Sequence, residues 1–250
     1  MSLIKNCILN KETKNTPIWL MRQAGRYLPE FREIRKYNPN FIELCLNENL
    51  SSEITIQPLK RFEFDAAIIF SDILMLPYAI GQKVEFKKGS GPLLGDFNYK
   101  DFLKVDEISF IKKLNPVYEA INRVKNNTLL EKKDLIGFTG APWTLLVYIL
   151  NKQSPKKTLD QNLFKDKNLI NKLLKIIDKF LKIHIKQQIK NGASVIQIFD
   201  SWAGLVEEKN LFNYIYNPTR QLVDFVKTLN VPVICFPRNI KKYKEYVENV

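Results

Sequence analysis

The chain contains 250 residues, of which 45% are hydrophobic, and it carries a net charge of +13. This length suffices for one sizeable hydrophobic core, and the composition excludes an intrinsically disordered chain. A positive surplus attracts anions, but the lysines are spread along predicted helices without an aromatic–basic module, so we expect a solvated surface and no nucleic-acid partner.

The cysteines indicate a reducing compartment. Cys7, Cys45 and Cys235 show neither an even count nor paired spacing, which is typical of reduced thiols in a cytoplasmic protein. Residues 1–15 lack the continuous apolar stretch of a signal peptide, and no segment is apolar over the length of a bilayer. We therefore predict a single cytoplasmic domain over residues 1–250, with no membrane partner.

Five short apolar runs are predicted strands, and none alternates cleanly between apolar and polar residues. Such runs are typical of strands buried on both faces, as in parallel sheets. In chain order they cover residues 18–21, 66–70, 135–138, 195–199 and 231–236.

Segments with helical periodicity follow these strands, so the order predicts an α/β protein of repeated βα units. A glycine-containing stretch at 83–98 falls outside the pattern and predicts a long excursion containing a small hairpin. The predicted helices cover residues 41–62, 114–124, 163–189, 211–229 and 240–250.

Polar and small side chains follow the first four predicted strands. In a (β/α)8 barrel the loops at this end of the strands build the active site, so we expect these side chains to converge on one pocket. They are Arg22, Gln23 and Arg26 after the first strand, Ser71 and Asp72 after the second, residues 139–144 and then Tyr148 after the third, and Asp200, Ser201 and Gly204 after the fourth.

Arg22 and Arg26 lie four residues apart with Gly25 between them. A guanidinium binds a carboxylate through two hydrogen bonds, and glycine lets the backbone approach a bulky ligand. The spacing therefore suits a substrate rich in carboxylates. The alternative for such a pair is a solvated basic turn.

Ordinary structural roles are also open to the other residues. Asp72 can cap the next helix, Tyr148 can be a core tyrosine, and Ser201 can be a turn serine. Asp200 can cap a helix or contact residues of the site without touching the substrate. His184, the only histidine, is predicted to be a surface or packing residue.

The motifs of common cofactor sites are missing from the sequence. One histidine and scattered cysteines do not supply the ligands of a usual zinc site. The chain contains no Walker loop, no G-x-G-x-x-G and no G-x-S-x-G. We expect no metal and no cofactor.

Four segments closely resemble those of the uroporphyrinogen decarboxylase family, and the resemblance runs from about residue 15 to residue 238. It implies a (β/α)8 TIM-barrel fold, a cytoplasmic homodimer, and a carboxy-lyase that uses no metal or organic cofactor. The implied reaction removes carboxyl groups from the four acetate side chains of uroporphyrinogen III, giving coproporphyrinogen III in haem (porphyrin) biosynthesis. The segments are PIWLMRQAGRYLPE (17–30), FDAAIIFSDIL (64–74), GFTGAPWTLLVY (137–148) and IQIFDSWAG (196–204).

The resemblance also implies roles for individual residues. Arg22 and Arg26 hold substrate carboxylates, and Asp72 lies beneath the macrocycle and accepts hydrogen bonds from its pyrrole N–H groups. Protonation of a ring carbon makes a cationic ring that takes up the electrons left by carbon dioxide, and a fixed carboxylate stabilises that charge. The proton donor is left open between water and a substrate carboxyl. Further substrate contacts are Gln23, Ala24, Gly25, Tyr148 and Ser201.

The sequence contains fewer predicted strands than the resemblance implies. Five predicted strands stand against the eight of a closed barrel, and a substrate-contacting histidine near the family's carboxyl end has no counterpart. We expect an incomplete barrel of about five βα units, as an inactive remnant, half of a split enzyme, a fragment of a longer protein or an open half-barrel. Expressed alone, such a chain is expected to be insoluble or inactive.

Two rival functions remain at this point. Corrinoid-dependent methyltransferases of the same superfamily use a zinc thiolate site, and the absence of a His-x-Cys pair argues against that function. A catalytically dead basic scaffold or RNA-associated protein would fit the charge. RNA binding that survives Arg22→Ala and Asp72→Ala would support it.

Overall fold

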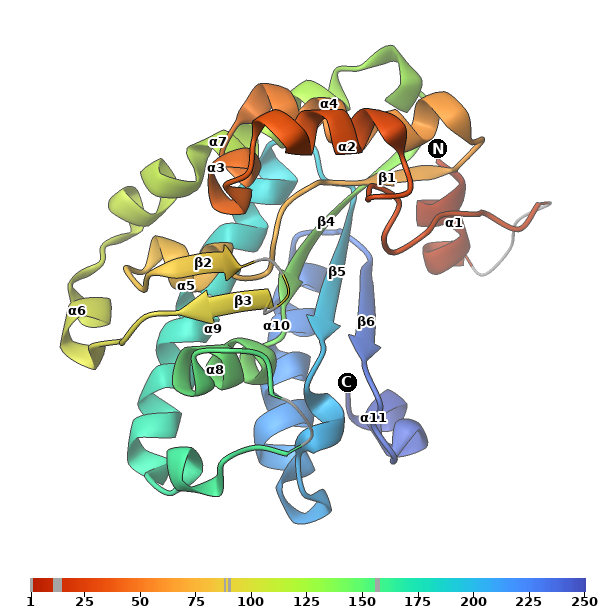
Figure 1. Ribbon diagram of the computed structural model, residues 1–250. Helices are drawn as coiled ribbons and strands as arrows, with labels where there is room; N and C mark the ends of the chain where they lie inside the picture. Colours follow the sequence, from red (N-terminus) through yellow and green to blue (C-terminus); the bar gives the residue numbers. More distant parts are fainter. Residues whose placement is uncertain (1, 11–14, 88, 90, 156–157) are drawn as a thin grey trace.

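A computed structural model describes residues 2–10, 15–87, 89, 91–155 and 158–250. Four parallel strands form its main sheet in the order β1-β4-β5-β6, and the arrows of β4, β5 and β6 point the same way in Figure 1. The strands are β1 (Ala66–Ile68), β4 (Asp134–Gly140), β5 (Val195–Asp200) and β6 (Val233–Pro237). The fold is therefore α/β with a parallel sheet in chain order, as predicted.

Helices connect and cover these strands, and α9 and α10 lie behind the sheet in Figure 1. Single-turn 3-10 segments occur at Thr128–Leu130, Gln161–Phe164, Ala203–Leu205 and Glu208–Asn210. The α-helices are α1 (Leu3–Asn10), α2 (Pro29–Tyr37), α3 (Phe41–Cys45), α4 (Glu48–Arg61), α5 (Met75–Ala79), α6 (Tyr99–Lys104), α7 (Glu107–Lys125), α8 (Pro142–Asn151), α9 (Lys167–Lys190), α10 (Asn217–Thr228) and α11 (Tyr243–Asn249).

The two faces of the sheet have different surroundings. On the face that packs against the helices, Leu135, Ile196 and Ile198 belong to the large hydrophobic core. A smaller cluster on the other face contains Ile136 and Val195 and is covered by α1. Alternate residues of one strand therefore reach opposite faces, as the pleat requires.

The first predicted strand, residues 18–21, is not part of the sheet. Ile18 and Leu20 are about half exposed. Side chains, and not a neighbouring strand, make most of the hydrogen bonds to the backbone of this segment. The Ile18 N–H donates to Asp65 Oδ2 at 2.7 Å, and the Ile18 carbonyl accepts from Asp65 N at 2.8 Å. The latter is the one backbone–backbone hydrogen bond that residues 18–21 make with the described part of the chain. Four strands, not five, therefore form the parallel sheet in the described residues.

Several predicted helices have different boundaries because polar side chains cap them. The segment 41–62 is two helices, since the Asn47 side chain accepts hydrogen bonds from Asn49 N and Leu50 N and starts α4. Asp166 likewise starts α9. Gly192, with φ +121°, follows its end. A five-residue π-helix at Phe212–Tyr216 precedes α10.

The predicted hairpin is confirmed as β2 (Val84–Lys87) paired with β3 (Gly91–Leu94). It is attached to the end of α8, because Leu94 N donates to the Lys152 carbonyl at 2.6 Å. The Gln82 side chain donates to the carbonyls of Gly95 and Ile149. The hairpin is thus fixed beside the carboxyl ends of the strands.

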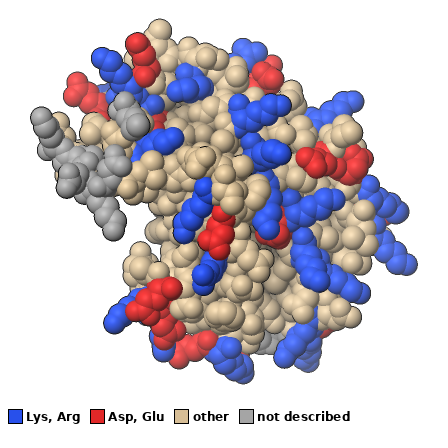
Figure 2. Space-filling view, turned by 180° about the vertical axis from the view of Figure 1, so that it is seen from behind, with Lys and Arg blue, Asp and Glu red and all other residues tan. Residues whose placement is uncertain are grey.

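Charged side chains are dispersed over the surface seen from behind. Figure 2 shows lysine and arginine scattered over this face with acidic residues between them. Among the described helices, none is both long and apolar enough to cross a membrane. The three cysteines are free. His184 is buried at 4% exposure, so it is a packing residue and not a surface residue.

Candidate active site

A cavity of about 630 Å³ opens at the carboxyl ends of the first three strands of the sheet. Its lining comes from the loop before α2, the turn after β1, helix α8 and the turn after β5. The cavity brings together Ser71 and the eight residues for which the resemblance implied a substrate role. These eight are Arg22, Gln23, Ala24, Gly25, Arg26, Asp72, Tyr148 and Ser201. Residues 139–144, Asp200 and Gly204, which were also expected in the pocket, are not part of its lining.

The arginine loop, residues 21–27, is anchored from its inner side by Gln23. This side chain is 1% exposed, and its Nε2 donates to the Ala66 carbonyl at 3.1 Å. Its Oε1 accepts from Leu20 N at 2.9 Å. Gln23 thus lies at the cavity but uses its amide to attach the loop to β1.

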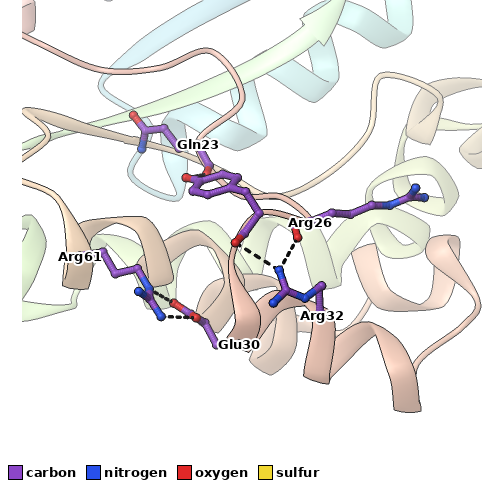
Figure 3. A network of polar contacts seen from close by, with 6 residues as sticks. Gln23, Arg26, Glu30, Arg32 and Arg61 are labelled. Carbon is purple, nitrogen blue, oxygen red and sulfur yellow. Dashed lines mark hydrogen bonds and ion pairs between the residues drawn. The ribbon is translucent and has the colours of Figure 1, made fainter.

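The outer end of the arginine loop is held by a second network (Figure 3). The Arg32 guanidinium donates to the carbonyls of Arg26 at 2.8 Å and Tyr27 at 3.2 Å. Close by, Arg61 forms two hydrogen bonds with Glu30, at 2.6 and 2.9 Å, and this pairing lowers the pKa of Glu30. The Arg26 side chain extends away from these contacts in Figure 3.

Both arginines predicted to bind substrate have exposed side chains. Neither the Arg22 guanidinium nor that of Arg26 has a hydrogen bond or ion pair with the residues that the structure describes. Burial and the nearby charge of Arg26 lower the pKa of Arg35. The mouth of the cavity therefore has positive charge available for an anionic ligand.

Asp72 supplies the one carboxylate of the lining. It is half-buried in the turn after β1, and its Oδ1 accepts from Leu74 N at 2.8 Å. Burial raises its pKa to about 6, against the opposing effects of the Leu74 hydrogen bond and the Arg22 charge. Among the described residues, Oδ2 receives no hydrogen bond. Asp72 therefore stabilises its own turn and still presents an oxygen to the cavity.

Tyr148 of α8 and Ser201 of the turn after β5 also line the cavity. The Tyr148 hydroxyl is 3.3 Å from Ser154 Oγ, and burial raises its pKa, so it stays protonated at neutral pH. Its ring meets Trp202 edge-on at 5.8 Å. Ser201, next to Trp202, is half-buried. Two hydroxyl-bearing side chains thus line the same cavity as the arginine loop.

Aromatic side chains form the remaining walls, and sequence reasoning missed them. Phe41 lies between Phe70 and Phe86, with ring centroids 5.7 and 4.6 Å away. Phe138 meets Phe199 edge-on at 5.4 Å. The signal was present in the sequence, since phenylalanine ends or nearly ends three strands immediately before the polar residues. These walls suit a flat, largely apolar ligand body.

Metal-ligating groups are not clustered here. Within the described part of the chain, no group of three or more His, Cys, Asp or Glu side chains could hold a metal ion. The site therefore offers guanidinium, carboxyl and hydroxyl groups on an aromatic frame.

Comparisons with known proteins agree with this geometry. Residues 1–249 match the family model described as uroporphyrinogen decarboxylase. The chain is 40% identical to a uroporphyrinogen decarboxylase of Rickettsia bellii, covering all of this chain and 74% of that protein. It is also 40% identical to one of Campylobacter jejuni, covering 99% of this chain and 74% of that protein.

A solved structure shares the fold at much lower identity. A methyltransferase from Methanosarcina mazei aligns with TM-score 0.72 over 93% of this chain and 67% of that one, at 16% identity. This likeness concerns the fold alone. The family match and the identity over the whole chain carry the conclusion that the chain belongs to the uroporphyrinogen decarboxylase family.

Proposed function

We propose that this protein decarboxylates the acetate side chains of uroporphyrinogen III to give coproporphyrinogen III, and that the cavity beside Arg22 and Asp72 is its active site. One observation carries the proposal: two guanidinium groups that have no partner among the described residues, and the carboxylate of Asp72, line the same cavity as Tyr148 and Ser201. The family membership of the chain supports the same reaction.

Arg22 and Arg26 bind substrate carboxylates in this proposal. A tetrapyrrole with eight carboxylates can engage both groups at the cavity mouth while its rings lie against the aromatic walls. Each charge-assisted hydrogen bond contributes about 1.5–3 kcal/mol. The arginine loop is already fixed by Gln23 and Arg32, so little ordering is needed when the substrate binds.

Asp72 stabilises the charge that develops on the ring. Protonation of a pyrrole carbon makes the ring cationic, and a carboxylate held close to it is most useful in a site shielded from water. Its pKa of about 6 leaves it ionised at neutral pH. The ring itself then accepts the electron pair of the bond that breaks when carbon dioxide leaves, so no separate electron sink is needed.

The resemblance extends the proposal to assembly and compartment. We expect a homodimer that works in the cytoplasm, with the tetrapyrrole as its ligand. Sedimentation of the purified protein tests the assembly.

The decisive experiment is an assay of purified protein with uroporphyrinogen III, with the products oxidised to porphyrins and separated by chromatography. Arg22→Ala should lower kcat/KM about 10- to 100-fold, because one charge-assisted contact is lost. Arg220→Ala is the matched control, since Arg220 is an exposed arginine on α10 whose carboxylate partner is Asp224 at 3.7 Å. Wild-type activity in Arg22→Ala would contradict the proposed role of the cavity. A folded wild-type protein that forms no coproporphyrinogen would contradict the proposed activity and support the inactive remnant or half of a split enzyme.

A further inference from the structure

The turn that carries Ser201 is tied to helix α8 by a buried hydrogen-bonded pair outside the cavity lining. Asp200, the last residue of β5, is 1% exposed, and Thr144 in the first turn of α8 is fully buried. Thr144 Oγ1 donates to Asp200 Oδ1 at 2.6 Å. The same Oγ1 accepts from Trp202 N at 3.1 Å. One hydroxyl thus holds the residues on both sides of Ser201.

Two further contacts join this turn to α8. Trp143 Nε1 donates to the Trp202 carbonyl at 3.2 Å. Tyr148, one turn after Thr144, meets the Trp202 ring edge-on at 5.8 Å. The helix that presents Tyr148 and the turn that presents Ser201 are therefore one connected unit, and Thr144 makes two of the three polar contacts named here.

We infer that Asp200 and Thr144 are a positioning pair, which sets Ser201 relative to Tyr148 for the reacting arm of the substrate. The inference rests on the proposed function of the cavity. Neither residue lines the cavity, so the pair acts through its neighbours and not on the substrate.

The carboxyl group of Asp200 is poorly explained by a contribution to stability alone. Asp200 Oδ2 is buried and has no hydrogen-bond partner among the described residues. Burial raises the pKa of Asp200 to about 7, opposed by the Thr144 hydrogen bond. A buried, half-satisfied carboxyl destabilises a fold relative to apolar side chains of similar volume. Retaining it is consistent with a gain in the geometry of the site.

Substitutions at both positions test the pair in the purified protein. Thr144→Val and Asp200→Val should each lower kcat 10- to 100-fold, because small displacements of contacting groups slow the chemical step. KM should change less than threefold, since the arginines are untouched. The double variant should be no slower than the slower single variant, because both changes break the same bond. Thr144→Ser keeps the hydroxyl and should retain at least a third of the wild-type kcat.

Thr219→Val is the matched control. Thr219 is 1% exposed, and its hydroxyl has no partner in the described structure, so its loss should leave kcat unchanged. If Thr144→Val and Asp200→Val lower melting temperature and kcat together and Thr144→Ser fails to restore kcat, the pair is only structural and the inference is overturned. Additive losses in the double variant would overturn it too.

A substrate-free readout separates this inference from the proposed function. Hydrogen exchange of the Trp202 amide should accelerate at least tenfold in Thr144→Val and stay within threefold of wild type in Thr144→Ser. An inactive wild-type protein would refute the proposed function, and with it the positioning role. Unchanged exchange in Thr144→Val, in an active wild-type background, would refute the pair alone.

Discussion

At Asp72, burial and a neighbouring guanidinium act in opposite directions on one carboxyl group. Burial is the larger effect and raises the pKa to about 6. The ionised form is the one that can stabilise a cationic ring, so protonation removes the useful species. Below pH 6 the wild-type kcat/KM should therefore fall about tenfold per pH unit.

Asp72→Asn should remove this acid limb and lower kcat about 100-fold or more at pH 7.5, because the developing positive charge loses its counterion. The measurement is the pH profile of kcat/KM with uroporphyrinogen. Asp224→Asn changes an exposed aspartate on α10 and should keep the wild-type profile. An Asp72→Asn enzyme that retains an acid limb near pH 6 would assign that limb to another group.

At the scale of elements, β4 and α9 are joined by a side-chain amide that acts like a strand partner. Gln188 accepts from Phe138 N and donates to the Phe138 carbonyl, both at 2.9 Å. Gly137 makes room for it, since an added Cβ would lie 2.6 Å from Gln188 Oε1 and 3.0 Å from Ala193 Cβ. The strand end that carries Phe138 into the cavity thus depends on a glycine beside it.

Gly137→Ala should therefore lower the free energy of unfolding by about 1–3 kcal/mol, because the new methyl group displaces a bonded amide and meets a neighbour that cannot move. Urea unfolding followed by circular dichroism measures the change. Gly25→Ala is the comparison, since its Cβ would meet only the Tyr27 ring, at 3.7 Å and beyond. Equal stability of the two variants would show that Gln188 adapts freely.

The pattern of apolar residues predicted the strands that are buried in the sheet. It failed where a segment is held by hydrogen bonds to side chains and not by a neighbouring strand. The strands at 66–70, 135–138, 195–199 and 231–236 correspond to β1, β4, β5 and β6. The run at 18–21 looked similar but is held by Asp65 and Gln23, contacts that no local pattern encodes. Helix α2 was missed, because its nine residues are mostly charged and carry few apolar side chains.

The site was predictable in part for a related reason. Polar residues after parallel strands must meet at one end of the sheet, so the meeting of Asp72 and Ser201 followed from chain order. Arg22 lines the same cavity although residues 18–21 are not in the sheet, because Gln23 attaches its loop to β1. The inward amide of Gln23 and the wall that Phe86 adds from the hairpin depend on tertiary packing. The chemical roles of these residues stay predictions until the variants are assayed.

Across the whole molecule, buried ionisable groups oppose one another in their effect on stability. Burial raises the pKa values of Asp72 to about 6 and Asp200 to about 7, so both groups favour the folded state as pH falls toward 4. Burial lowers the pKa of His184 to about 4, against about 6.5 for an exposed histidine. This histidine therefore favours the unfolded state as pH falls from 6.5 to 4. The pH dependence of the free energy of unfolding is the sum of these contributions, so a substitution is needed to isolate one of them.

His184→Gln isolates the histidine contribution, since His184 Nδ1 lies 3.0 Å from the Tyr118 hydroxyl between α9 and α7. At pH 7 the variant should be about 1 kcal/mol less stable than wild type, because that hydrogen bond is weakened. Between pH 7 and pH 5 the wild type should lose about 2 kcal/mol relative to the variant, since only its unfolded state takes up the extra proton. Tyr118→Phe keeps the buried imidazole and should lose stability in acid as wild type does. Urea unfolding at both pH values measures the difference, and a constant gap between wild type and His184→Gln would show that His184 does not drive the acid sensitivity of this fold.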